Sequence, residues 1–194
     1  MERPVIYVKR ITNLSDARYC AGMGADLLGF VASPGHEDYV SPVAFKEIMG
    51  WVSGPRRVVE LTDLPAGGFD EVISNYSPDL IHISFNVSSS LIIPDFPFII
   101  EAVDVVGSVS NLKKLGGTKI EFIVAASSRT DSEILKIKAL NSNLLIAMGK
   151  NEALLAGMLT RTGAAGIVLQ GSPELRPGLK DYDHLSTVLE ALDF

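Results

Sequence analysis

The sequence predicts an α/β protein, a single small (β/α)8 barrel, and three observations support this fold class. Short apolar runs of strand character recur eight times in the 194 residues, and most of them begin 18 to 24 residues apart. Each run leaves room for one helix before the next run, and this alternation predicts a parallel sheet. No linker or low-complexity stretch interrupts the pattern, so we expect one domain over residues 1–194. An open, doubly wound sheet is the alternative architecture.

The expected strands consist mainly of Val, Ile, Leu and Phe, and helix signals stand between several of them. The strands cover residues 5–8, 27–31, 57–61, 80–83, 98–103, 121–125, 144–148 and 165–169. Ser15-Asp16 is expected to cap one helix, and Ser41 followed by Pro42 predicts another that ends at Gly54. Further helices are expected to begin at Asp131, Asn151 and Asp181.

The composition, with 47% hydrophobic and 21% charged residues, is typical of a soluble globular protein. Lys and Arg number 17 and Asp and Glu number 23, which gives a formal net charge of −6 and no basic stripe. We therefore expect no nucleic-acid partner and no membrane partner. The single cysteine, Cys20, excludes a disulfide scaffold and a multi-cysteine zinc site. The first residues lack the pattern of a signal peptide, so we expect a cytoplasmic protein.

Polar residues at the strand ends are the candidates for chemistry, because barrels of this class carry their active sites at the C-terminal ends of the strands. The candidate catalytic residues there are Lys9, His82 and Glu101. The ends of the seventh and eighth strands often bind phosphate in this fold. The candidate phosphate- or substrate-binding residues are Arg10, Gly149, Lys150, Gly171 and Ser172. Three scattered histidines without a carboxylate cluster predict no metal site.

Each catalytic candidate also has a structural interpretation. Lys9 is a general base, a nucleophile that forms an imine, or a buried lysine paired with Glu101 or Glu60. The pairing is favoured because buried charges are seldom left alone. Glu101 is accordingly either an acid in catalysis or the counter-ion of Lys9. His82 is either a catalytic imidazole or a hydrogen-bonded structural group. Arg10 and Lys150 either meet a phosphate or lie as solvated charges at the rim.

Two groups of motifs at the ends of the chain resemble a known family. The N-terminal part contains VKRITN (8–13), DA (16–17), GAD (24–26), GFV (29–31) and YVSP (39–42). The C-terminal part contains ELRPGLKDYD (174–183), which includes a Pro-Gly-x-Lys-Asp motif. These motifs resemble those of phosphoribosylanthranilate isomerase, and the order of elements agrees over essentially the whole chain. The resemblance implies a (β/α)8 barrel of tryptophan biosynthesis that acts without a metal or organic cofactor.

The reaction that this resemblance implies is an Amadori rearrangement of a phosphorylated aminoaldose to an aminoketose. A general acid protonates the ring oxygen of the ribose and opens the ring to an imine. A general base then removes the proton from C2′, and the resulting enolamine becomes the ketone. Two groups whose pKa values are set apart by their surroundings suit this work.

The sequence departs from the family pattern at both catalytic positions. The family's general base is a cysteine followed by a glycine, and Lys9 and Arg10 occupy these two positions. The family's general acid is an aspartate at the end of strand six, and the run FIVAA (122–126) has an alanine at that position. Asp38 occupies the position at which the family has a substrate-contacting arginine. The family motifs of strands four, seven and eight are replaced by His82-Ile83-Ser84, Ala147-Met148-Gly149 and Gln170-Gly171-Ser172.

Three functions from different classes therefore remain open. The first is the isomerase with replaced catalytic residues, and the second is a non-catalytic barrel that binds a phosphosugar-like ligand or a protein partner. The third is an enzyme that forms an imine through Lys9. A small phosphorylated sugar is the expected ligand in the first case. Barrels of this size occur as monomers and as dimers, and the sequence fits either a monomer or a homodimer.

Overall fold

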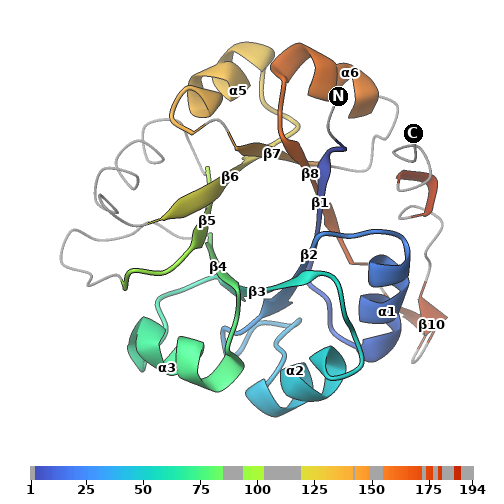
Figure 1. Cartoon of the computed structure of the whole chain (residues 1–194), viewed down its shortest axis with the longest axis vertical. Coiled ribbons are helices and arrows are strands. Elements are labelled where there is room, and N and C mark those ends of the chain that lie inside the picture. The colour runs from blue at the N-terminus through green and yellow to red at the C-terminus, as the bar shows by residue number, and fades with distance from the viewer. Residues whose placement is uncertain are drawn as a thin grey trace.

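The computed structural model describes residues 3–84, 94–102, 119–141, 143–148, 155–171, 174–176, 179–180 and 186–188. Eight parallel strands follow one another around a closed barrel (Figure 1). They are β1 (Val5–Lys9), β2 (Leu27–Val31), β3 (Arg56–Leu61), β4 (Leu80–Ile83), β5 (Phe98–Glu101), β6 (Ile120–Ala126), β7 (Leu144–Ala147) and β8 (Gly166–Gln170). The predicted (β/α)8 fold class is confirmed.

The pairing of the first strand with the last distinguishes a closed barrel from an open sheet. β1 pairs with β8 over five residues, from Val5 opposite Gly166 to Lys9 opposite Gln170. Gly166 permits this close approach, because a Cβ atom at this position would lie 2.1 Å from the carbonyl oxygen of Val5. The open, doubly wound alternative is therefore excluded.

The described helices lie outside the barrel (Figure 1). They are α1 (Leu14–Gly22), α2 (Pro42–Met49), α3 (Gly68–Tyr76), α5 (Asp131–Lys138) and α6 (Leu155–Thr162). α2 begins as predicted, with Pro42 in its first turn and the Ser41 hydroxyl accepting the backbone N–H of Ala44. α5 begins with a capping box in which Thr130 and Glu133 each accept the other's backbone N–H.

The predicted cap of α1 is wrong. Asn13 precedes the helix in an extended conformation, and its side-chain oxygen accepts the backbone N–H of Asp16 at 2.9 Å. Ser15 and Asp16 already lie in the first helical turn, so neither can occupy the extended cap position. Asn13 is an equally good capping residue that stands directly before the turn.

The predicted end of α2 is also wrong. The helix ends at Met49, and Gly50 is its C-terminal cap, with a backbone N–H bonded to the carbonyl of Lys46. Gly54, the predicted end, has φ 107 and lies in the loop that leads to β3. The predicted helix starts at Asn151 and Asp181 lie outside the described residues.

After the barrel, the chain forms a short hairpin that the sequence did not predict. β9 (Glu174–Arg176) and β10 (Leu179–Lys180) pair in antiparallel fashion as a separate two-stranded sheet. The hairpin includes part of the C-terminal motif that resembles the isomerase family. The described residues of that motif, Glu174–Arg176 and Leu179–Lys180, therefore lie outside the eight-stranded sheet.

Alternate residues of the strands fill the interior of the barrel with an apolar core. The buried members of this core are Tyr7, Leu27, Val58, Leu80, Ile99, Phe122, Val124, Leu145 and Val168. The residues between them face outward and pack beneath the helices. Phe45 of α2, for example, meets Phe30 and Tyr76 edge to face at ring-centroid distances of 5.0 and 5.4 Å. Residues two positions beyond the core residues point into the C-terminal end of the barrel, because side chains alternate along a strand.

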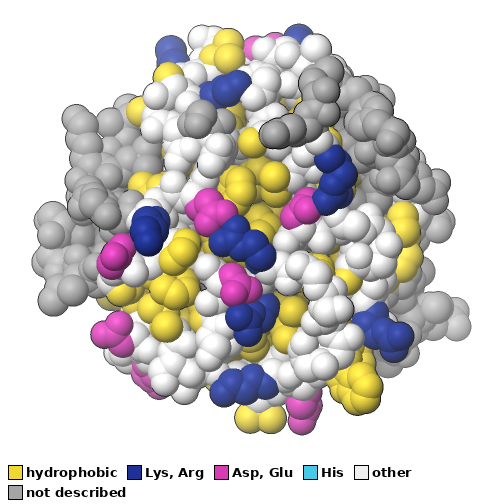
Figure 2. Space-filling view, in the orientation of Figure 1, with side chains coloured by type: hydrophobic (Ala, Val, Ile, Leu, Met, Phe, Trp, Pro, Cys, Tyr) yellow, Lys and Arg dark blue, Asp and Glu magenta, His cyan; other side chains and the backbone are white. Residues whose placement is uncertain are grey.

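Ion pairs lie at the opposite end, where the strands begin. Arg57 donates to Asp79 at 2.9 and 3.0 Å, and Arg56 forms a two-bond pair with Glu121. Figure 2 shows Lys and Arg side chains next to Asp and Glu side chains near the middle of the face that it presents. The four paired side chains are 30 to 42% exposed. Water screens such pairs, so each contributes at most about 1 kcal/mol to stability.

Gly166→Ala is expected to destabilise the protein where β8 closes the barrel. The added Cβ would lie 2.1 Å from the oxygen and 2.7 Å from the nitrogen of Val5, and only a backbone shift relieves these contacts. Such overpacking costs about 1–3 kcal/mol, which urea denaturation measures. Gly22→Ala is the matched control, since nothing lies within 4 Å of its new Cβ at the end of α1. Equal destabilisation in both variants would contradict the role assigned to Gly166.

Candidate functional site

Four ionisable side chains meet inside the C-terminal end of the barrel. Lys9 ends β1 and Glu101 ends β5, while Glu60 of β3 lies opposite His82 of β4 in the parallel register. Each follows an interior core residue by two positions, so all four point into the barrel. The three residues predicted as catalytic, Lys9, His82 and Glu101, are thus brought together. We refer to these four residues as the charged cluster.

Lys9 is held by two carboxylates. Its Nζ lies 2.9 Å from Glu101 Oε2 and 3.9 Å from Glu60 Oε2. The exposed fractions of the side chains are 16% for Lys9, 6% for Glu60 and 34% for Glu101. The predicted pairing of Lys9 with Glu101 or Glu60 is confirmed, and it involves both. Glu101 is the most exposed of the three side chains.

Glu60 is the buried acid of the cluster. Its Oε1 accepts the backbone N–H of Arg10 at 2.7 Å. Burial raises the pKa of the Glu60 carboxyl, and the charge of Lys9 and the Arg10 bond offset only part of that rise. Gly29 makes room for this carboxylate, because a Cβ there would lie 2.3 Å from Glu60 Oε1 and 2.7 Å from the Tyr7 hydroxyl. A glycine in β2 is therefore a requirement of the site.

Arg10 stands in a left-handed backbone conformation with φ 58, which is unfavourable for a residue with a side chain. This conformation accompanies the bond from its N–H to Glu60. The family resemblance places a glycine at this position, and glycine adopts this conformation without strain. The Arg10 guanidinium lies 3.6 Å from the Asp38 carboxylate. The cation predicted to contact a phosphate is thus already next to an anion of this chain.

His82 lies deepest in the cluster and contacts a residue that the sequence did not single out. The Tyr7 hydroxyl is 3.1 Å from His82 Nδ1, and both side chains are buried. The other ring nitrogen, Nε2, lies 3.5 Å from Glu101 Oε2 and has no hydrogen-bond partner. Burial, and secondarily the charge of Lys9, lower the pKa of His82 well below its usual value. Burial, and then Glu60 and Glu101, raise the pKa of Tyr7.

The end of β6 carries no acid. The strand ends with Ala125, which is buried, and Ala126, which is exposed. The carboxylate of this strand, Glu121, lies near its start and is paired with Arg56. No carboxylate of β6 therefore replaces the aspartate that the family has at this strand end.

The predicted phosphate-binding residues are only partly described. Gly149, Lys150 and Ser172 lie outside the described residues. Gly171 follows β8, and its backbone N–H donates to the carbonyl oxygen of Lys9 at 2.7 Å. That N–H continues the β1–β8 ladder and is therefore occupied. A phosphate site at this end of the barrel stays a prediction.

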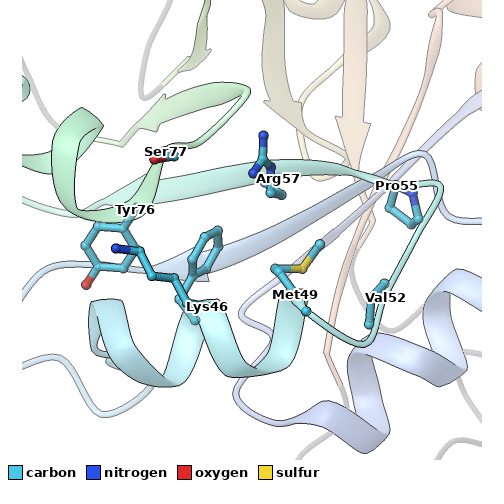
Figure 3. A pocket seen from close by; sticks show the side chains of 9 residues that line it. Lys46, Met49, Val52, Pro55, Arg57, Tyr76 and Ser77 are labelled. Carbon is cyan, nitrogen blue, oxygen red and sulfur yellow. The ribbon is translucent and has the colours of Figure 1, made fainter.

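Within the described parts of the chain, no group of three or more His, Cys, Asp and Glu side chains could hold a metal ion. The same parts contain no helix with the length and apolar character needed to cross a membrane. A hollow of about 480 Å3 lies between α2 and α3, against the start of β3 (Figure 3). It is lined by Phe45, Lys46, Met49, Gly50, Val52, Pro55, Arg57, Tyr76 and Ser77. None of these residues belongs to the charged cluster, so the hollow is separate from the candidate site.

The chain resembles known proteins in its structure. No protein-family model matches the chain, and no curated protein matches it. Phosphoribosylanthranilate isomerase of Thermotoga maritima, as monomers generated from the dimeric enzyme, matches with a TM-score of 0.76 and 18% identity over 97% of this chain and 98% of that chain. The enzyme of Thermus thermophilus matches with a TM-score of 0.75 and 17% identity, with the same coverage of 97% and 98%.

A third similar structure is phosphoribosylanthranilate isomerase in complex with reduced 1-(o-carboxyphenylamino)-1-deoxyribulose 5-phosphate. It matches with a TM-score of 0.74 and 18% identity over 96% of this chain and 97% of that chain. The fold and these similarities define a (β/α)8 barrel. These phosphoribosylanthranilate isomerases have the same fold, and the resemblance noted in the sequence is supported at that level.

Glu60→Gln is expected to change the pH dependence of stability. The raised pKa of Glu60 means that the folded protein keeps a proton that the unfolded chain releases near pH 4.5. The stability that this protonated carboxyl contributes is present below the unfolded pKa and is lost as the pH rises through the folded pKa. Glutamine keeps an acceptor for the Arg10 N–H and never ionises. As the pH rises from about 4.5 to the raised pKa of Glu60 in the folded protein, the free energy of unfolding of the variant should increase relative to that of wild type, by at most ~1.4 kcal/mol per pH unit.

Urea denaturation at a series of pH values measures this difference. The exposed Glu47→Gln is the control, since a solvated carboxylate has nearly the same surroundings in both states. A free-energy difference between Glu60→Gln and wild type that stays constant with pH would show that Glu60 ionises normally in the folded protein.

Proposed function

We propose that this barrel catalyses an Amadori-type aldose–ketose isomerisation of a phosphoribosyl amine, with Lys9 and Glu101 as its acid–base pair. One observation carries the proposal: Lys9 Nζ lies 2.9 Å from Glu101 Oε2 where barrel enzymes hold their reacting groups. The substrate class is supported by the structural similarity to phosphoribosylanthranilate isomerases, one of them in complex with a phosphorylated compound. The reaction needs one group that donates a proton and one that accepts a proton, and an ammonium and a carboxylate can take these two roles.

In the proposed reaction, the Lys9 ammonium is the general acid. It protonates the ring oxygen as the C1′–oxygen bond breaks, and the nitrogen lone pair forms the C1′=N bond of the iminium. The Glu101 carboxylate then takes the proton from C2′, and the electron pair of that C–H bond neutralises the iminium to give the enolamine. The enolamine becomes the ketone when its hydroxyl proton is lost and C1′ is protonated.

The direct contact between the two groups closes the proton cycle. After the reaction, Lys9 has lost a proton and Glu101 has gained one. Because the two atoms are hydrogen-bonded at 2.9 Å, the proton on Glu101 passes to the Lys9 amine without a mediator. Glu60 stays 3.9 Å from Nζ and fixes the lysine during the cycle. No metal or organic cofactor takes part in this scheme.

For substrate binding, we propose the ends of β7 and β8 as the phosphate site. Gly149, Lys150, Gly171 and Ser172 remain its candidate residues, and Arg10 is a further candidate at the rim. The backbone N–H of Gly171 is bonded to Lys9, so Gly171 would act there by shaping the turn. The protein works as a monomer or a homodimer in this proposal.

Lys9→Met and Glu101→Gln are each expected to lower isomerase turnover by roughly 100- to 10,000-fold, because each removes one partner in proton transfer. Phosphoribosylanthranilate is generated in situ, and its loss is followed by fluorescence. Lys136→Met, on the exposed face of α5, is the matched lysine control and should leave kcat unchanged. Circular dichroism shows whether each variant is folded.

The absence of turnover above the uncatalysed background in the wild-type protein would overturn the proposed isomerase. The alanines at the end of β6 would then favour the non-catalytic alternative, a barrel that binds a phosphosugar-like ligand or a protein partner. A rise in melting temperature with ribose 5-phosphate, without turnover, would support that alternative.

The second candidate is an imine-forming enzyme, and a different aspect of the same contact favours it. The Lys9 side chain is 16% exposed, and its amine lies beside two carboxylates. When a carbinolamine loses water, one of these carboxyl groups can supply the proton that leaves with the hydroxyl group. Borohydride reduction in the presence of ribulose 5-phosphate, followed by peptide mass analysis, distinguishes the two functions. The acid–base proposal expects no adduct on Lys9 beyond that on the control Lys136. A selective adduct on Lys9 would replace it with the imine mechanism.

A further inference from the structure

A buried pair of rings stands behind the proposed catalytic carboxylate. Tyr7 of β1 and His82 of β4 lie across the barrel interior from each other, at a centroid distance of 5.7 Å and an interplanar angle of 63°. Both side chains are at most 1% exposed. The Tyr7 hydroxyl is 3.1 Å from His82 Nδ1, and His82 Nε2 points toward Glu101 Oε2 at 3.5 Å without a hydrogen-bond partner. A buried polar atom without a partner is costly, so this orientation calls for a physical reason.

We infer that Tyr7 and His82 form a hydrogen-bond relay that orients Glu101 from behind, with the Tyr7 hydroxyl donating to His82 Nδ1 and the His82 Nε2–H aimed at Glu101. In this arrangement, Glu101 Oε2 faces the Lys9 ammonium on one side and an imidazole N–H on the other. Tyr7 and His82 are positioning residues, since they act through Glu101 and reach no other part of the proposed reaction.

The charges around the relay favour the His82 tautomer with its hydrogen on Nε2 over the tautomer with its hydrogen on Nδ1. The groups that face His82 are Tyr7 and Lys9 from β1, Glu60 from β3 and Glu101 from β5. A second cation next to Lys9 is disfavoured in a buried site, so the ring is neutral and carries one N–H. If this N–H were on Nδ1, the lone pair of Nε2 would face the Glu101 carboxylate, and two acceptors would repel each other.

The distance of 3.5 Å fits a contact that closes during the reaction. It exceeds a normal N–H···O hydrogen bond by about half an ångström. Glu101 is the most exposed member of the charged cluster, with 34% of its side chain accessible, whereas His82 is fixed in the core. A small rotation of Glu101 shortens the contact and leaves the carboxylate oriented toward the mouth of the barrel. The relay thus limits the positions from which Glu101 removes a proton.

Long-range 15N–1H NMR of the wild-type protein tests the arrangement directly. The expected spectrum for His82 has an unprotonated Nδ1 and a protonated Nε2, with no change as the pH passes through the usual pKa of histidine, about 6.5. In Tyr7→Phe, which removes only the donor to Nδ1, the ring should become a mixture of tautomers. Tyr76→Phe is the matched control, because it removes another buried tyrosine hydrogen bond, 2.8 Å to the Val40 carbonyl. It should leave the His82 signals unchanged.

Kinetics test the positioning role, which rests on the proposed isomerase function. Tyr7→Phe and His82→Leu should lower kcat about tenfold with KM nearly unchanged, because they loosen a positioned group without touching substrate. His82→Gln restores an N–H donor and should recover most of the lost kcat. Equal kcat in the glutamine and leucine variants would refute the donor role of His82.

The two readouts separate a failure of the inference from a failure of the proposed function. A protonated Nδ1 in the wild-type spectrum would overturn the relay, whether or not the protein is an isomerase. A protonated Nε2 together with an inactive wild-type protein would leave the relay in place and remove only the isomerase. If Tyr7→Phe does not fold, the wild-type spectrum alone decides the tautomer.

Discussion

The balance of charge around Lys9 is the constraint on which the C-terminal end of the barrel depends. The Lys9 side chain is only 16% exposed, and the effective cost of burying an isolated ion is several kcal/mol, so its ammonium needs partners. Glu101 and Glu60 provide the partners, at 2.9 and 3.9 Å. Glu60 in turn needs the backbone N–H of Arg10, because burial disfavours its charged form. Removing any of these groups leaves another one buried and unsatisfied, so the cluster forms as a unit.

This constraint extends into the backbone. Arg10 has a φ of 58, a conformation that costs a residue with a side chain about 1–2 kcal/mol. The hydrogen bond from the Arg10 N–H to Glu60 contributes about 0.5–1.5 kcal/mol, which offsets much of that strain. On the other side of Glu60, Gly29 leaves the volume that the carboxylate fills. Gly29 of β2 thus contributes to the site because it has no side chain. Arg10, directly after β1, contributes an N–H that is held in a strained backbone conformation.

The sequence predicted the barrel and part of the site, and the reasons differ. The strands were recognisable because their apolar runs are spaced for one helix each, and closure followed from their number. The pairing of Lys9 with Glu101 was predictable because a buried charge needs an opposite charge and few candidates exist. The contact of Tyr7 with His82 was not predictable, since it joins β1 and β4 across the interior. Such contacts depend on the tilt of the strands around the closed barrel, and the sequence pattern of apolar residues does not reveal this tilt.

The proposed reaction differs from the family scheme in where its two proton-transfer groups stand. The resemblance implies a base on the first strand and an acid on the sixth, on separate parts of the rim. In this chain, β6 ends in alanines, and the acid and base of the proposal are Lys9 and Glu101, which are in direct contact. Two groups 2.9 Å apart cannot lie on opposite sides of a sugar ring. In the proposal, both proton transfers therefore use the same face of the substrate, and the proton taken from C2′ restores the one that Lys9 gave to the ring oxygen. The apolar core lies two residues below this layer, and its side chains take no part in the proposed reaction, so the barrel tolerates such a change.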